Sequence, residues 1–292
     1  MTWRMVIVNK HSKLSYQNNA LVFKSADNIE KIHLSEIHTL LVETTDVVLT
    51  TALIAKLVEY KIKMIFCDAK RLPCAELTPY YGSHDTSKKV GLQIKWNKEN
   101  QKIIWTKVIE QKINNQMLHL LSLGKREEAE KLNHYLLALS INDETNREGH
   151  AAKVYFNALF GKEFTRELEN DINRSLNYGY ALLLSMFARE IVKNGCLTQL
   201  GLKHTNYFNS FNLASDLMEP FRPLVDEIVL KYHKLDFRHA KRQLLSLFST
   251  TYLFEGKEMY LVNIVEIYVK KILDALNESE REIPKFVFTW GK

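Results

Sequence analysis

Residues 78–89, TPYYGSHDTSKK, separate two parts of the chain that have different apolar patterns. The stretch is polar, contains Gly82 and lacks apolar periodicity, which is typical of a connection between domains. Upstream of it the apolar residues occur in short runs, whereas downstream they recur at the spacing of a helix. The sequence therefore predicts an interdomain linker, which we assign to residues 79–89.

Residues 1–78 have the pattern of a β-rich domain that contains one helix. Thr50 or Thr51 can cap this helix, in which Ile54, Leu57 and Val58 share one face. Five short strands leave sheet edges, and an exposed edge can pair with another chain unless the domain's own helix and loops cover it. We therefore expect this domain to mediate dimerisation. The predicted strands are Arg4–Val8, Ala20–Lys24, Ile29–Leu34, Ile37–Glu43 and Lys63–Cys67.

Residues 90–280 have the pattern of an all-helical domain. Asp171 can cap a long apolar helix that ends near Gly195, and Gly179 inside this helix indicates the close approach of another helix. Further helical patterns cover 103–121, 125–139, 212–232 and 257–277. The predicted fold class is thus α+β, with a small N-terminal β-rich domain followed by a larger all-α domain.

The last residues, 281–292, are expected to form an extended tail. Pro284 breaks the preceding helical pattern, and Phe286, Phe288 and Trp290 alternate with their neighbours as in an extended segment.

Composition and charge limit the class of protein. The chain has 292 residues, of which 46% are hydrophobic and 25% charged, as in ordinary globular proteins. Its three cysteines include no CxxC pair, which excludes a zinc knuckle, argues against a disulfide framework and fits a reducing compartment. No apolar run approaches the length of a membrane span. We therefore expect a soluble cytoplasmic protein with no membrane contact.

A modest basic excess permits a nucleic-acid partner without requiring one. The net charge is +6, and residues 86–135 contain ten basic against five acidic side chains. The alternative is an ordinary solvated surface.

Glu148 is the first candidate functional residue. It precedes Ala151, Ala152 and Tyr155 by three, four and seven positions, and therefore shares their apolar helical face. A carboxylate on such a face is costly unless it is paired, protonated or bound to a cation. The alternative is a glutamate in the first turn, where the helix dipole favours a negative charge.

The segment 201–223, GLKHTNYFNSFNLASDLMEPFRP, supplies three more candidates. Asp216 and Glu219 are three positions apart, so their carboxylates repel each other unless a divalent cation or an arginine lies between them. Arg222 or Arg238 can fill that role without any metal. His204 adds a nitrogen donor. Together with Glu148, these residues form a candidate cation-binding set.

Three segments, in this order, resemble a known family: Glu148 within NREGHAAKVYF, LNYGYALL (176–183) and KHTNYFNSFNLASDLMEPFRP (203–223). They are similar to the signature segments of the CRISPR-associated endonuclease/integrase, the catalytic subunit of the machinery that inserts new spacers into a CRISPR array. The resemblance implies that Glu148, His204 and Glu219 are catalytic ligands of Mg²⁺ or Mn²⁺, with Asp216 supporting them. Much of the family has Asp at the position of Glu219, and the Glu form resembles the type II branch.

The resemblance also implies an activity and partners. The activity is metal-dependent endonuclease and integrase chemistry, in which a DNA 3′-hydroxyl attacks a phosphodiester of the CRISPR repeat. The partners are a second copy in a homodimer, a small ferredoxin-like CRISPR-associated subunit that bridges two dimers, and double-stranded protospacer and repeat DNA. Two other functions stay open: a non-catalytic nucleic-acid-binding scaffold with arginines among its carboxylates, and a helical metallohydrolase of small molecules. The basic excess and the lack of a Gly-rich loop disfavour the metallohydrolase.

A DNA substrate requires basic side chains around the acidic residues. Arg238, Lys241 and Arg242 have the spacing i, i+3 and i+4, which predicts one shared helical face. The alternative is that they form surface ion pairs with Glu227 or Asp236. The full set of candidate DNA-binding residues is Lys162, Arg166, Arg174, Arg222, Arg238, Lys241 and Arg242.

Overall fold

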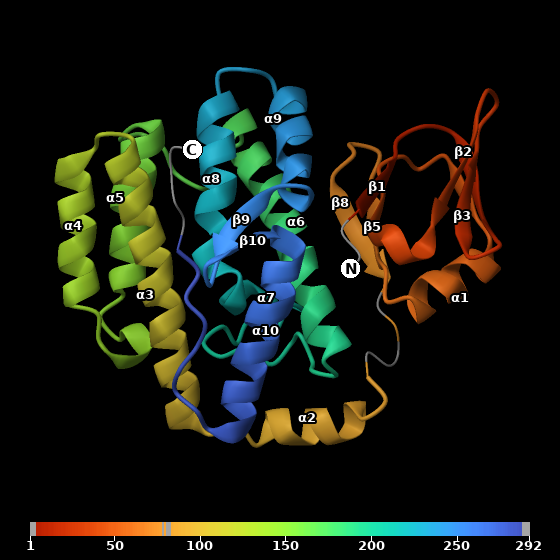
Figure 1. Ribbon diagram of the computed structural model, residues 1–292. Helices are drawn as coiled ribbons and strands as arrows, with labels where there is room; N and C mark the ends of the chain where they lie inside the picture. Colours follow the sequence, from red (N-terminus) through yellow and green to blue (C-terminus); the bar gives the residue numbers. More distant parts are fainter. Residues whose placement is uncertain (1–3, 78, 80–82, 288–292) are drawn as a thin grey trace.

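A computed structural model describes residues 4–77, 79 and 83–287 of the chain (Figure 1). A β-rich domain, red to orange in Figure 1, lies beside a larger helical domain. The strands of the first domain end at Leu77 and the first helix of the second begins at Thr86, inside the segment assigned to the linker. The predicted fold class, a β-rich domain followed by a mostly helical one, is confirmed.

Two four-stranded sheets form the β-rich domain, with strand orders β1-β5-β7-β8 and β4-β3-β2-β6. All five predicted strands are present to within one residue, whereas β2, β6 and β8 were not predicted because β2 is largely polar, β6 is very short and β8 begins at a proline. The elements are β1 (Arg4–Val8), β2 (Ser12–Gln17), β3 (Ala20–Lys24), β4 (Ile29–His33), β5 (Ile37–Val42), β6 (Val47–Leu49), α1 (Thr51–Glu59), β7 (Lys63–Cys67) and β8 (Pro73–Leu77).

The core of this domain lies between α1 and the strands. Thr50 caps α1, since its hydroxyl accepts a hydrogen bond from the Leu53 N–H at 3.3 Å. Leu53 and Leu57 are fully buried in the same apolar cluster as Leu40. Strand β5 is buried along its whole length between two parallel neighbours, which explains its nearly continuous apolar sequence.

The helical domain is organised around the long helix α6. It contains α2 (Thr86–Ile94), α3 (Lys98–Ser122), α4 (Arg126–Leu137), α5 (Arg147–Phe160), α6 (Asp171–Lys193), α7 (Asn212–Leu217), α8 (Arg222–Tyr232), α9 (Phe237–Leu244), β9 (Thr251–Phe254), β10 (Lys257–Tyr260) and α10 (Leu261–Glu278). A Cβ atom at Gly179 would lie 2.4 Å from the Val225 Cγ1 of α8 and 2.9 Å from the Leu244 Cδ2 of α9. The predicted close approach of another helix at Gly179 is therefore confirmed. The N-cap of α6 is Asn170 rather than Asp171, because the Asn170 side chain accepts a hydrogen bond from the Asn173 N–H at 2.8 Å.

One element departs from the all-helical prediction. Residues 257–260, expected at the start of a helix, form β10 and pair with β9 in an antiparallel hairpin. Glu255 and Gly256 connect the strands with positive φ angles of 48° and 78°, as a tight hairpin turn requires. The helical pattern begins only after this turn, at Leu261.

The C-terminal segment packs along α3 instead of leaving the domain (Figure 1). Residues 280–287 form no helix, as predicted. The Gln111 side chain accepts a hydrogen bond from the Phe286 N–H at 2.9 Å and donates one to the Pro284 carbonyl at 3.1 Å. Phe286 is fully buried and stacks on Phe221, with ring centroids 4.0 Å apart. The predicted alternation at Phe288 and Trp290 lies outside the described residues.

Buried polar contacts connect the two domains. The Lys241 ammonium of α9 lies 3.0 Å from a Glu43 carboxylate oxygen of the β-rich domain and donates to the Arg71 carbonyl at 3.2 Å. The Tyr178 hydroxyl of α6 donates to the same Glu43 carboxylate at 3.4 Å. In the described part of the chain, no helix has the length and apolar character needed to cross a membrane.

Candidate functional site

Glu148 and Glu219 meet around the ammonium group of Lys112. Glu148 lies in the first turn of α5, Glu219 in the single turn between α7 and α8, and Lys112 in the middle of α3. The Lys112 Nζ forms an ion pair with Glu148 and lies 2.5 Å from the Glu219 Oε2. The carboxylates converge on one cation although they come from separate elements.

Local hydrogen bonds fix the first turn of α5. Asn146 caps the helix by accepting from the Gly149 N–H at 3.3 Å, and the Asp143 carboxylate accepts from the Glu148 N–H at 3.0 Å. Because these groups satisfy the backbone of the turn, the Glu148 side chain is left to face Lys112.

His204 is positioned by the buried carboxylate of Asp216. The Asp216 Oδ1 contacts the His204 Nδ1, and the Asp216 Oδ2 accepts from the backbone N–H groups of Leu202 at 2.6 Å and Lys203 at 3.0 Å. The loop can wrap around Asp216 because Gly201 has no Cβ: such an atom would lie 2.4 Å from the His204 carbonyl. In the neutral form of His204, Nδ1 donates to Asp216 and Nε2 keeps its lone pair for a ligand.

The pKa shifts in this cluster follow from its charges. The hydrogen bond to Asp216 raises the pKa of His204. Burial by itself would lower the pKa of Lys112, but the negative charges of Glu219 and Glu148 outweigh burial and raise it. The pKa of Glu148 is lowered, chiefly by the positive charge of Lys112. Lys112 and Glu148 are therefore charged together in the neutral pH range.

The donor chemistry fits a divalent cation. In the part of the chain that the structure describes, no three acidic, histidine or cysteine groups already surround one point closely enough to hold a metal ion. Glu148 and Glu219 nevertheless already share one cation, the Lys112 ammonium, and His204 presents a nitrogen of fixed orientation. Two carboxylates and an imidazole suit Mg²⁺ or Mn²⁺, and a carboxylate behind the imidazole is the usual support for a histidine ligand.

Arg222 contacts this centre, and Arg166 packs on the same aromatic ring as Arg222. The Arg222 Nε lies 2.9 Å from the Glu219 Oε1, as an ion pair rather than a directed hydrogen bond, and its guanidinium lies 4.6 Å from the Tyr180 ring centroid. Arg166 lies over the same ring and donates to the Asn177 Oδ1 at 2.6 Å. The alternative that an arginine neutralises part of the acidic set thus applies to Glu219.

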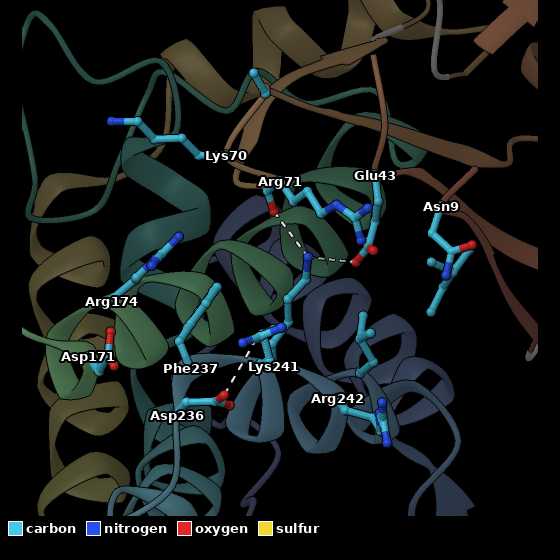
Figure 2. Close-up of a pocket in the computed structure, with 14 residues that line it drawn as sticks. Asn9, Glu43, Lys70, Arg71, Asp171, Arg174, Asp236, Phe237, Lys241 and Arg242 are labelled. Atoms are coloured by element: carbon cyan, nitrogen blue, oxygen red, sulfur yellow. Dashed lines mark hydrogen bonds and ion pairs between the residues drawn. The ribbon is translucent and has the colours of Figure 1, made fainter. Parts of the chain in front are cut away.

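The candidate basic residues of α9 line a cleft of about 820 Å³ between the two domains (Figure 2). The Arg238 side chain is 90% exposed and Arg242 is also exposed, whereas the Lys241 side chain is only 10% exposed because it pairs with Glu43. Arg238, Lys241 and Arg242 share one face as predicted, but the Lys241 ammonium pairs with Glu43 of the β-rich domain. Asp236 lies 3.5 Å from Arg238, which is one of the surface pairs considered as the alternative.

The remaining basic candidates are divided between the cleft and the surface. Arg174 lines the cleft and lies over the Phe237 ring, 4.2 Å from its centroid. Lys162 is exposed after the end of α5. The cleft also includes Lys70 and Arg71 of the β-rich domain, which sequence analysis did not select because they lie in a turn without a motif.

Sequence analysis also missed Lys112. It follows the buried residues Val108 and Ile109 by four and three positions, so it belongs to the apolar face of α3. A lysine on an apolar helical face indicates a buried partner of opposite charge. The same reasoning selected Glu148 and could have selected Lys112.

These observations agree with the comparisons to known proteins. The model of the family described as "CRISPR associated protein Cas1" matches residues 5–241. The chain belongs to the Cas1 family. The "CRISPR-associated endonuclease Cas1" of Neisseria meningitidis serogroup C (strain 8013) is 35% identical to it over 234 residues, which cover 80% of this chain and 77% of the relative. The predicted family, a CRISPR-associated endonuclease/integrase, is confirmed, and the type II-like branch stays a prediction.

Solved structures share the fold. A casposase bound to an integration product aligns with a TM-score of 0.77 at 18% identity, covering 98% of this chain and 94% of that chain. A Cas6-RT-Cas1–Cas2 complex aligns with a TM-score of 0.77 at 18% identity, covering 97% of this chain and 36% of that longer chain. At this level of identity the alignments show that the fold is shared.

Proposed function

We propose that this Cas1-family protein is a metal-dependent DNA endonuclease and integrase that inserts spacer DNA into a CRISPR array. The observation that carries the proposal is the convergence of Glu148 and Glu219 on one cation, with His204 close enough that, besides its hydrogen bond to Asp216, the charges of both glutamates raise its pKa. The names of the relatives support it, since one is a CRISPR-associated endonuclease and a structural neighbour is a casposase bound to an integration product.

In the proposed reaction, a DNA 3′-oxygen forms a bond to a phosphorus of the repeat and loses its proton. The bond from that phosphorus to the neighbouring 3′-oxygen breaks, and the leaving oxygen takes up a proton. Mg²⁺ or Mn²⁺ held by Glu148, His204 and Glu219 supplies stabilisation of the charge that builds on the phosphodiester oxygens. Asp216 fixes the orientation of His204, and Arg222 holds the second oxygen of Glu219.

Double-stranded DNA is the proposed substrate, bound in part along the interdomain cleft. Arg174, Arg238 and Arg242 line the cleft, and Lys70 and Arg71 extend its basic surface onto the β-rich domain (Figure 2). Contacts of this kind neutralise phosphates and do not read bases, so binding is expected to be salt-dependent and tolerant of sequence.

The proposed assembly is a homodimer, two of which are bridged by a small ferredoxin-like CRISPR-associated subunit. A structural neighbour is a complex that contains Cas2, which supports a Cas partner here. The edge strands β4 and β6 also favour pairing with another chain, because the Ile29 and Val48 side chains on them are each 59% exposed. We propose a cytoplasmic location, which the free thiols of Cys67, Cys74 and Cys196 support.

The test is a strand-joining assay. The protein, its predicted partner subunit, a short DNA duplex, a repeat-containing plasmid and Mn²⁺ are mixed, and joined products are resolved on a denaturing gel. Glu148→Ala, His204→Ala and Glu219→Ala should each abolish joining, whereas Glu110→Ala, at an exposed position of α3, should not. Full joining by folded Glu148→Ala would refute the proposal.

A second function is favoured by one observation, the neutralisation of Glu219 by Lys112 and Arg222. In a non-catalytic nucleic-acid-binding scaffold, these ion pairs would persist and the carboxylates would bind no metal ion. The two functions differ in metal binding. An integrase should bind Mn²⁺, and the Glu148→Ala variant should not. A scaffold should not need a metal ion, so it should bind DNA equally well in the presence of a chelator.

A further inference from the structure

Lys112 occupies the point at which the two acidic side chains converge. Its side chain is only 7% exposed and lies on the face of α3 that also contains the buried residues Val108 and Ile109. The ammonium contacts Glu148 of α5 and lies 2.5 Å from Glu219 of the turn before α8. A buried lysine is costly unless it is paired, and here one ammonium group is paired with both carboxylates.

The charges around Glu148 and Glu219 already balance. Lys112 and Arg222 carry two positive charges against the two negative charges of Glu148 and Glu219, while the Asp216 carboxylate is engaged by His204 and by backbone N–H groups. A divalent ion between the same carboxylates would add two positive charges to these four balanced groups. The site is partly buried, with the Lys112, Glu219 and Glu148 side chains 7%, 4% and 28% exposed, so Coulomb interactions there are stronger than in water. Binding of the ion is therefore favoured when one of the two basic side chains withdraws.

Lys112 is better placed to withdraw than Arg222. Arg222 contacts Oε1 of Glu219, the oxygen that Lys112 does not contact, and its guanidinium also packs on the Tyr180 ring. Lys112 is a point charge on a flexible four-carbon chain, and its two carboxylate partners are the two proposed metal ligands.

We propose that Lys112 is a tethered counter-cation of the acidic centre. Its ammonium group holds Glu148 and Glu219 together in the metal-free protein, competes with the divalent ion for them, and so weakens metal binding. The inference rests on the metal site of the proposed function.

The test compares Mn²⁺ binding by the full-length protein, without DNA, in the wild type and in Lys112→Met. Binding is measured from the electron paramagnetic resonance signal of free Mn²⁺. Loss of a competing charge-assisted contact should tighten binding about tenfold. Without metal, Lys112→Met should melt at a lower temperature than the wild type, because the two carboxylates then repel each other, and Mn²⁺ should raise its melting temperature by more.

The matched control is Lys107→Met, which removes a lysine of the same helix that pairs with Glu282 at 2.7 Å. It should bind Mn²⁺ as the wild type does. Equal or weaker Mn²⁺ binding by folded Lys112→Met would overturn the inference and leave the metal site standing. Absence of Mn²⁺ binding in both proteins would overturn the metal site and the inference together.

A wild-type measurement covers the case in which Lys112→Met does not fold. In protein labelled with ¹⁵N-lysine, the Lys112 ammonium should give a slowly exchanging signal without metal, assigned by its loss in Lys112→Arg. Mg²⁺ should shift or remove this signal, because the ammonium leaves its carboxylates. A signal that is unchanged at saturating Mg²⁺ would overturn the inference.

Discussion

Asp226 makes the stability of the helical domain depend on pH in an unusual direction. It is fully buried on α8 and accepts a hydrogen bond from the Tyr180 hydroxyl of α6. Burial raises the pKa of its carboxyl group from the ordinary value of 3.8 to about 6, because the charged form loses its hydration. The folded protein therefore binds this proton more tightly than the unfolded chain does.

The sign and size of the effect follow from that shift. The stability that the protonated carboxyl contributes is fully present below the ordinary pKa of 3.8 and is lost as the pH rises through about 6. A shift of about two pKa units corresponds to about 3 kcal/mol. The amide introduced by Asp226→Asn cannot ionise, so the free energy of unfolding of this variant, relative to the wild type, should increase by about 3 kcal/mol between about pH 3 and about pH 7.

Urea denaturation followed by circular dichroism at several pH values measures this difference. Asp27→Asn, in the exposed turn between β3 and β4, is the control, and its difference from the wild type should not follow the same curve. The reasoning would be refuted if the Asp226→Asn difference stayed constant over this pH range, or if it decreased with rising pH.

Three further variants test the domain contact, the C-terminal segment and the cleft. Lys241→Met leaves a buried carboxylate without its cation and should lower the free energy of unfolding by about 3–5 kcal/mol, measured by urea denaturation. Phe286→Ala removes a fully buried ring and should cost about 3–5 kcal/mol in the same assay; a loss below about 1 kcal/mol would show that the segment is not docked in solution. The double variant Arg238→Ala/Arg242→Ala should reduce the slope of log affinity for duplex DNA against log salt by about 1.8, measured by fluorescence anisotropy, and an unchanged slope would remove both residues from the DNA path.

The sequence by itself determined the features that depend on residues close to one another along the chain. The change of apolar pattern at 78–89, the helix cap at Thr50 or Thr51 and the interior glycine at 179 each predict local structure from residues close in sequence. The structure has the cap at Thr50 and a close helix contact at Gly179, whereas α2 begins at Thr86, inside the segment assigned to the linker. The motif segments also selected Glu148, His204, Asp216 and Glu219 as candidate site residues, because the resemblance preserves their order along the chain.

Only the tertiary structure decided which charges these residues meet. Lys112 reaches Glu148 from another helix, and Lys241 reaches Glu43 from the other domain. Helical periodicity shows that Lys112 lies on a buried face, but it does not show which side chains lie opposite that face. The apolar pattern did not predict the hairpin at 251–260 for a related reason: its strands are short and are stabilised by pairing with each other. Contacts between distant segments depend on how whole elements pack, so the same apolar pattern is compatible with many partners for a buried charge.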